Sequence, residues 1–285
     1  MYAPYIGTEL PNSRAKLDAY GWKLEAETGM SGGDWDACHD STLHLLWEQG
    51  RKAGLRIKTE IYNLFAASCP QMAKPDKRGL YDTDRKRQGL VPDAHILQGQ
   101  ENIKSTGLAE LKFIRCCPSR YPGTNGRTAV ATRASKIQSE YDKKATDAEE
   151  AFGMPQGRLL MALHSYGPIT PWVLGAYGEA NEGIHTYIED LANLKTRKAA
   201  LEHDRNPLGM KGQIKSQLRR AVGVHVARAN ADVGINRLKY IGTGGAMALA
   251  RRNERLAQRR AEEEERRAHH EASFALVHPK RTGWA

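Results

Sequence analysis

The chain has 285 residues, and its 43 lysines and arginines against 33 aspartates and glutamates give a formal net charge of +10 at pH 7. Hydrophobic residues make up 40% of the chain, yet no run approaches the roughly 18 consecutive apolar residues of a membrane-spanning helix. The composition therefore argues against a membrane protein, and the charge favours a polyanionic partner, first of all nucleic acid.

The four cysteines are too few and too scattered for a disulfide framework, and none belongs to a C-x-x-C pair. This usage indicates a reducing, intracellular compartment, the nucleus included.

Residues 1–35 are predicted to form an N-terminal appendage. A weakly amphipathic helix over Ser13–Glu27 ends in the sequence Gly-Met-Ser-Gly-Gly at 29–33. This segment matches the G-x-S-x-G pattern of a nucleophile elbow, which requires a preceding apolar strand. Because the residues before it favour a helix, the segment is interpreted as a linker.

The next elements alternate between helical and extended patterns. Apolar spacing predicts a helix over Cys38–Ala53, and alternation predicts a strand over Leu55–Phe65. A polar connector, Cys69–Gln88, carries a run of basic residues. Two further strands are expected over Val91–Leu97 and Gly107–Ile114.

A long helix is predicted over Thr128–Phe152, with Tyr141 on its apolar face, followed by a strand over Gly167–Tyr177 and a helix over Gly183–Leu194. The order of helix, three strands, helix, strand and helix indicates an α/β domain around a mixed sheet.

Four regions follow from these patterns. The appendage at 1–35 precedes an α/β domain at 36–195, a basic helical extension at 196–243 and a charged helical or disordered tail at 244–285. The tail consists largely of Arg, Glu and Ala, with opposite charges four residues apart.

Three polar residues on the two neighbouring strands are the strongest candidates for chemistry. Glu110 and Lys112 are two residues apart in an apolar strand, so both side chains project from one face, while Leu111 points to the other. If the strand carrying Asp93 pairs with this one, the three polar groups converge. Two carboxylates and water suit Mg²⁺, with Mn²⁺ as a substitute.

The arrangement Pro92-Asp93, a gap, and then Glu110-Leu111-Lys112 resembles the PD-(D/E)XK nuclease superfamily, as does the predicted order of elements. The resemblance implies a restriction-endonuclease-like αβββαβ core with C-terminal helices added. It also implies that Asp93, Glu110 and the carbonyl of Leu111 hold the metal, and that Lys112 positions and helps to deprotonate the attacking water.

Further residues follow from the same resemblance. An additional acid is expected on the first helix or the next strand, where Glu48 and Glu60 are the candidates. The residues expected to contact nucleic acid are Arg87, Arg115, Arg120, Tyr121, Arg127, Gln138, Tyr141 and Lys144. The segment through Tyr240 resembles companions of this domain in mobile-element reading frames, which implies an association with mobile elements.

The expected function is metal-dependent hydrolysis of DNA, with RNA as an alternative substrate and with endonuclease and exonuclease cleavage both compatible. A nucleic-acid-binding protein that keeps the fold without catalysis is the second hypothesis, and a structural protein with merely solvating charge is the third. His39 and His44 are five residues apart on one helix, which is not the spacing of a zinc-binding helix. The oligomeric state stays open.

Overall fold

The structure is a computed structural model, and it describes most of the chain between residues 34 and 242. The described residues are 6–7, 9–10, 16–18, 23–24, 34–59, 61, 64–69, 90–97, 104–115, 121, 126–203 and 207–242, without the side chains of 202–203, 207–208 and 240–242. The predicted helix at 13–27, most of the connector at 69–88 and the tail at 244–285 lie largely or wholly outside these residues.

The described elements alternate as the sequence predicts. Their bounds in chain order are α2 Asp34–Lys52, β1 Ile57–Thr59, β2 Ala94–Ile96, β3 Gly107–Phe113, α3 Gly126–Ala134, α4 Ile137–Ala151, α5 Arg158–His164, β4 Thr170–Leu174, α6 Glu182–His203 and α7 Pro207–Gly242. The protein is therefore mixed α/β, and every described strand is shorter than its predicted segment.

The four strands form one mixed sheet in the order β1-β2-β3-β4. The two hairpin-like pairings are antiparallel, and β4 lies parallel to β3. Ala94 pairs with Ala109, which confirms the predicted pairing of the strand after Asp93 with the strand that carries Glu110.

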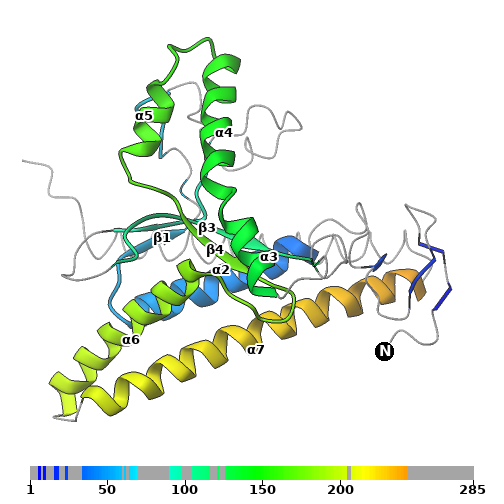
Figure 1. Ribbon diagram of the computed structural model, residues 1–285, viewed down its shortest axis with the longest axis vertical. Coiled ribbons are helices and arrows are strands. Elements are labelled where there is room, and N and C mark those ends of the chain that lie inside the picture. The colour runs from blue at the N-terminus through cyan, green and yellow to red at the C-terminus, as the bar shows by residue number, and fades with distance from the viewer. Residues whose placement is uncertain are drawn as a thin grey trace, which may run out of the picture.

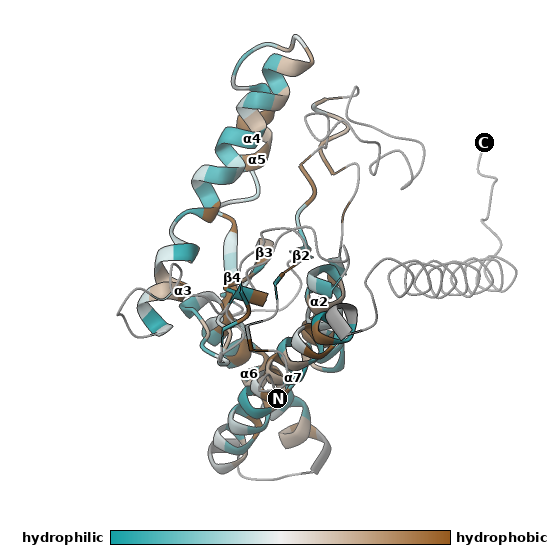
Figure 2. Cartoon of the chain, turned by 90° about the vertical axis from the view of Figure 1, so that its right-hand side faces the viewer, coloured by the Kyte–Doolittle hydropathy of each residue, from teal (hydrophilic) through white to brown (hydrophobic). Residues whose placement is uncertain are grey.

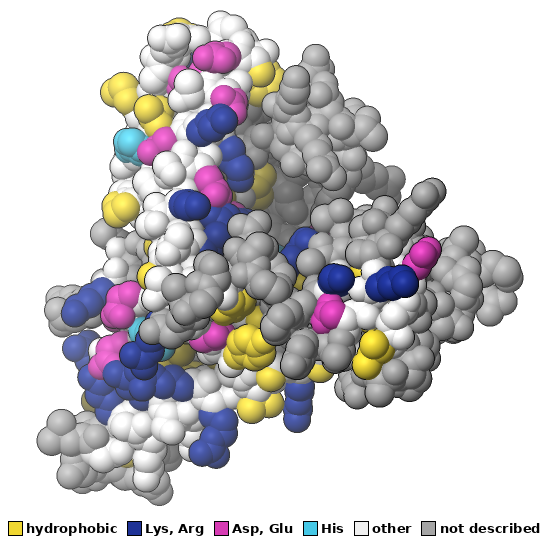
Figure 3. All heavy atoms as spheres, turned by 45° about the vertical axis from the view of Figure 1, so that its right-hand side comes forward, with side chains coloured by type: hydrophobic (Ala, Val, Ile, Leu, Met, Phe, Trp, Pro, Cys, Tyr) yellow, Lys and Arg dark blue, Asp and Glu magenta, His cyan; other side chains and the backbone are white. Residues whose placement is uncertain are grey.

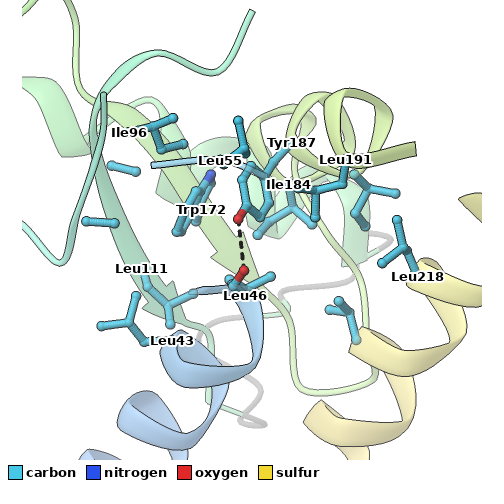
Figure 4. Close-up of a cluster of buried hydrophobic side chains, with 14 of the residues drawn as sticks. Leu43, Leu46, Leu55, Ile96, Leu111, Trp172, Ile184, Tyr187, Leu191 and Leu218 are labelled. Atoms are coloured by element: carbon cyan, nitrogen blue, oxygen red, sulfur yellow. Dashed lines mark hydrogen bonds between the residues drawn. The ribbon is translucent and has the colours of Figure 1, made fainter. Parts of the chain in front are cut away.

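Helices cover both faces of the sheet (Figure 1). On one face, α2, α6 and α7 enclose a core that includes Leu111, Trp172 and Leu218. Figure 4 shows this core, in which the hydroxyl of Tyr187 donates a hydrogen bond of 2.8 Å to the carbonyl of Leu46. Because Leu218 and its neighbours on α7 belong to this core, the predicted basic extension packs directly against the α/β elements.

On the other face, α3 and the two helices α4 and α5 contribute to a second core that includes Leu108, Tyr141 and Val173. Helices α4 and α5 stand away from the sheet as an arm, with hydrophilic residues on its outer side (Figure 2). Leu108 and Leu111 enter different cores, as expected for strand residues of opposite parity.

The predicted helix 128–152 is two helices, because the chain turns at Ser135 and Lys136. The Ser135 hydroxyl donates a hydrogen bond of 3.0 Å to the carbonyl of Thr132, a local bond that competes with regular helix hydrogen bonding. Both guanidinium branches of Arg133 donate to the carboxylate of Glu140, at 2.7 and 2.9 Å, and join the two helices across the turn.

Helix α5 was not predicted, and Glu149 of α4 explains how so short a helix begins. Its buried carboxylate accepts hydrogen bonds from the backbone N–H groups of Gly157, Leu159 and Leu160, at 2.7, 2.5 and 3.1 Å. An anionic acceptor satisfies N–H groups that have no partner within the helix.

We expect Glu149→Ala to lower the free energy of unfolding by about 3 kcal/mol, roughly 1 kcal/mol for each lost hydrogen bond. Urea denaturation checks this, with Glu150→Ala as the control, because Glu150 is the next residue on α4 and its side chain is exposed. An equal loss in both variants would contradict the capping role.

Within the part of the chain that the structure describes, no helix has both the length and the apolar character needed to cross a membrane.

Candidate active site

Asp93 lies where the ladder between β2 and β3 stops. Ala94 and Ala109 are the last paired residues, and beyond them the N–H of Leu111 donates a hydrogen bond of 2.7 Å to Oδ2 of Asp93 instead of to a strand backbone. The carboxylate of Asp93 thus occupies the place where β2 would otherwise continue, and 15% of its side chain is exposed.

Glu110 and Lys112 project from the face of β3 that α4 covers, as their spacing predicts. Glu110 is only 3% exposed, and Oε1 of its carboxylate forms an ion pair with the ammonium of Lys112. The side chain of Lys112 is 33% exposed, so this ammonium links a buried carboxylate to the surface. The structure therefore brings Asp93, Glu110 and Lys112 together.

Tyr141 of α4 belongs to this cluster instead of to an accessible surface. Its side chain is 2% exposed, and its hydroxyl donates a hydrogen bond of 2.5 Å to Oε2 of Glu110. The same hydroxyl lies 3.3 Å from the carbonyl of Val91, two residues before Asp93. The expected direct contact of Tyr141 with nucleic acid does not fit this burial, because the ring lies in the core. Tyr141 instead orients Glu110.

His39 of α2 is the residue that sequence reasoning missed. Its Nε2 lies 3.1 Å from Oδ2 of Asp93, and its Nδ1 lies 3.2 Å from Oδ1 of Asp40. Considered only together with His44, it had the wrong spacing for a zinc helix. No sequence pattern identified it, because its contact with Asp93 joins residues that are 54 positions apart in the chain. We refer to Asp93, Glu110, Lys112, Tyr141 and His39 as the candidate site.

The two acids of the candidate site have opposite electrostatic environments. Burial alone would raise the pKa of Asp93, but the hydrogen bond from His39, the charge of Lys112 and the N–H of Leu111 lower it below the usual range. Burial and the charge of Asp93 raise the pKa of Glu110, against the opposing effects of Lys112 and Tyr141. Asp93 is thus the more readily ionised acid.

His39 and Tyr141 are also held in one protonation state. Burial would lower the pKa of His39, but its hydrogen bonds to Asp40 and Asp93 raise it to about 10. Burial and the neighbouring Glu110 raise the pKa of Tyr141 far above its ordinary value, so its hydroxyl stays a hydrogen-bond donor. In the metal-free protein at neutral pH, His39 and Lys112 therefore both balance the carboxylates.

The donor atoms fit a hard divalent cation. Within a strand, the N–H and C=O of one residue point to the same side, so the carbonyl of Leu111 faces the side of Asp93, as its N–H does. Two carboxylates and one carbonyl provide the oxygen ligands that Mg²⁺ requires, since this ion keeps several waters. His39 is not one of these ligands, because its raised pKa keeps both ring nitrogens protonated beside Asp93. Among the described residues, no three His, Cys, Asp or Glu side chains form a ready-made metal cluster.

Glu48 does not lie with the candidate site. It forms an ion pair of 2.7 Å with Lys52 on α2. Glu48 follows His39 by nine residues, about two and a half helical turns, so the two side chains lie on opposite faces of α2 and about 13 Å apart along its axis. Glu60, the other expected acid, lies outside the described residues.

The residues expected to contact nucleic acid have different positions. Gln138 supports the fold. Its side-chain N–H donates a hydrogen bond to the carboxylate of Asp142, and its side-chain oxygen accepts one from the backbone N–H of Ile169. Lys144 is exposed, with its ammonium 4.8 Å from the centre of the Tyr141 ring. The hydroxyl of Tyr121 accepts a hydrogen bond of 2.8 Å from the N–H of Ala176.

Two of the expected arginines are accessible to differing degrees. Arg127 is exposed in the first turn of α3, and Arg115 is half-buried after β3. Arg87 and Arg120 lie outside the described residues.

Comparisons with known proteins add no relationship to this geometry: no family model matches the chain, and neither a curated protein nor a solved structure is significantly similar to it.

Proposed function

We propose that the protein is a metal-dependent nuclease that hydrolyses phosphodiester bonds, with DNA as the first substrate to test and RNA as the alternative. The observation that carries this proposal is the convergence of Asp93, Glu110 and Lys112 at the end of β2. The succession of α2, three strands, α3 with α4, and β4 supports the resemblance to the restriction-endonuclease-like core, with α5 as an insertion.

Asp93, Glu110 and the Leu111 carbonyl are the residues that would hold the metal. A bound Mg²⁺ or Mn²⁺ polarises a phosphate oxygen and lowers the pKa of a water molecule. Tyr141 holds Oε2 of Glu110, which leaves Oε1, the oxygen paired with Lys112, as the one that would bind a metal. His39 and the N–H of Leu111 hold Oδ2 of Asp93.

Lys112 is the residue that would handle the proton of the attacking water. Its ammonium reaches from the partly exposed edge of the site to the buried carboxylate of Glu110. As an ammonium, Lys112 can exchange its partner from the carboxylate to a water molecule and orient that water, and it could accept the water's proton only after giving up its own to solvent.

Basic side chains near the site support a nucleic-acid substrate. Burial alone would raise the pKa of Glu140, but Arg133 near the end of α3 and Lys144 on the arm lower it. Figure 3 shows Lys and Arg side chains along the arm and a denser group on the lower part of the molecule, where α6 and α7 pack together. Between these two packed helices, Lys211 and Lys215 of α7 pair with Glu189 of α6. An intracellular location, where nucleic acid is available, follows from the proposal.

A cleavage assay on labelled DNA and RNA tests the proposal. We expect cleavage with Mg²⁺ or Mn²⁺, its loss when EDTA is added, and its return when excess metal is restored. Asp93→Asn should remove cleavage while keeping nucleic-acid binding, because Asp93 serves the metal and not the phosphate backbone. Binding by the wild type without cleavage in either metal would instead support the alternative, a non-catalytic nucleic-acid-binding protein.

A further inference from the structure

Arg115 and Trp35 form a stacked pair beside the candidate site. The guanidinium carbon of Arg115 lies 5.2 Å from the centre of the Trp35 ring, and both side chains are half-buried. Stacking on an aromatic ring restricts the guanidinium while leaving the N–H donors in its plane able to bind a ligand. The stacking therefore lowers the conformational entropy that the Arg115 side chain would lose when it binds a ligand.

Neither donor group of the pair has an acceptor among the residues that the structure describes. No carboxylate among the described residues pairs with Arg115. The indole N–H of Trp35 is buried and, within the same described residues, has no hydrogen-bond partner. A buried donor without an acceptor costs free energy. A ligand rich in acceptor oxygens would pair with the half-buried guanidinium of Arg115, and a phosphate group matches its fork of donors.

The pair flanks the candidate site on its α2 side. Trp35 precedes His39 by four residues, which places both on one face of α2 at about 6 Å along the helix axis. His39 in turn contacts Asp93. Arg115 follows Lys112 by three residues, about 10 Å along an extended chain. The pair therefore lies next to the candidate site but supplies none of its carboxylates.

We propose that Arg115, held on the ring of Trp35, binds the phosphate group of the nucleotide next to the phosphodiester that is cleaved. The identity of this ligand rests on the proposed nuclease function. A substrate that contains a single phosphate would occupy the metal site alone, whereas a nucleic-acid strand would reach both positions.

Fluorescence anisotropy with a labelled DNA oligonucleotide, in EDTA and over a series of KCl concentrations, tests this contact without cleavage. We expect Arg115→Gln to raise Kd about tenfold, as the loss of one charge-assisted contact would. We also expect the slope of log K against log salt to fall by about one, because one fewer phosphate is neutralised. Circular dichroism and thermal melting verify the fold.

Arg51→Gln provides a matched control. Arg51 also stacks on a tryptophan of α2, with its guanidinium carbon 4.9 Å from the centre of the Trp47 ring. Trp47 lies twelve residues from Trp35, about 18 Å farther along the helix. We expect Arg51→Gln to leave Kd and the salt slope close to those of the wild type.

Trp35→Leu removes the aromatic face and keeps an apolar side chain, and Trp35→Phe serves as the milder variant if the leucine variant unfolds. We expect either change to weaken binding, and the effects of Trp35 and Arg115 changes to be less than additive, because the ring acts through the arginine.

Equal effects of Arg115→Gln and Arg51→Gln, or an unchanged salt slope in Arg115→Gln, would overturn this inference even if the wild type cleaves DNA. Conversely, a selective effect of Arg115→Gln in a protein that never cleaves would keep the phosphate contact and reject the nuclease proposal.

Discussion

Glu110→Gln is expected to abolish cleavage and, at neutral pH, to make the metal-free protein more stable. The variant loses the negative charge of a carboxylate that would bind the metal. We expect the cleavage rate to fall by about 10³-fold or more, because metal polarisation of the phosphate contributes several kcal/mol. The glutamine keeps the shape of Glu110 and an oxygen that can accept the Tyr141 hydroxyl. Removing a buried charge beside Asp93 should stabilise the fold by about 1 kcal/mol.

The pH dependence of this stabilisation has a definite sign. Because burial and Asp93 raise the pKa of Glu110 in the folded protein, Glu110 contributes most to stability below the pKa of an unfolded glutamate. That contribution disappears as the pH rises through the folded pKa. The stability of Glu110→Gln relative to the wild type should therefore increase with pH over this range, reaching about 2–4 °C in melting temperature.

Thermal melting in EDTA across pH measures the change in stability, and the cleavage assay in Mn²⁺ measures the loss of activity. Glu140→Gln is the control, since the pKa of Glu140 is lowered below its usual range: burial acts to raise it, but the hydrogen bond from Arg133 outweighs this effect. Its relative stability should follow the opposite trend with pH. A melting temperature of Glu110→Gln below that of the wild type at neutral pH would show that the Lys112 ion pair outweighs the burial of the charge.

Lys112→Met is expected to lower the cleavage rate by about 10²–10⁴-fold, the usual contribution of a positioned proton-transfer group, while Mn²⁺ affinity stays of the same order. Methionine fills the volume of the lysine stem, and the metal takes over the charge balance of Glu110 and Asp93. The rate at saturating substrate and a separate Mn²⁺ titration distinguish the two properties.

Lys144→Met is the matched variant for this experiment, because Lys144 is a nearby exposed lysine that contacts the ring of Tyr141 instead of a carboxylate. It should raise KM for a nucleic-acid substrate with little change in kcat. If Lys112→Met instead behaves like Lys144→Met, Lys112 binds the backbone and does not act on the water.

Much of the candidate site was accessible from the sequence because a strand has a period of two. Glu110 and Lys112 had to share a face, and Leu111 had to enter the opposite core, whatever the rest of the molecule did. The position of Asp93 depended on one further assumption, that the two strands pair, and the pair Ala94 and Ala109 confirms it. The apolar face of the helix predicted over Thr128–Phe152 likewise indicated that Tyr141 faces inward.

The contacts of His39, the oxygen that Tyr141 binds and the stacking of Arg115 on Trp35 depend on the rotation of α2 and α4 against the sheet. That rotation results from packing among residues distant in the chain, so no local spacing specifies it.

By itself, the amino-acid sequence determined the mixed α/β class, the strands and the shared face of Glu110 and Lys112, since these follow from short-range periodicity. Only the tertiary structure decided which groups balance the two carboxylates, that Glu48 stands apart from them and that α5 begins on the carboxylate of Glu149. Those properties arise from distances through space, and such distances exist only once the helices have packed on the sheet.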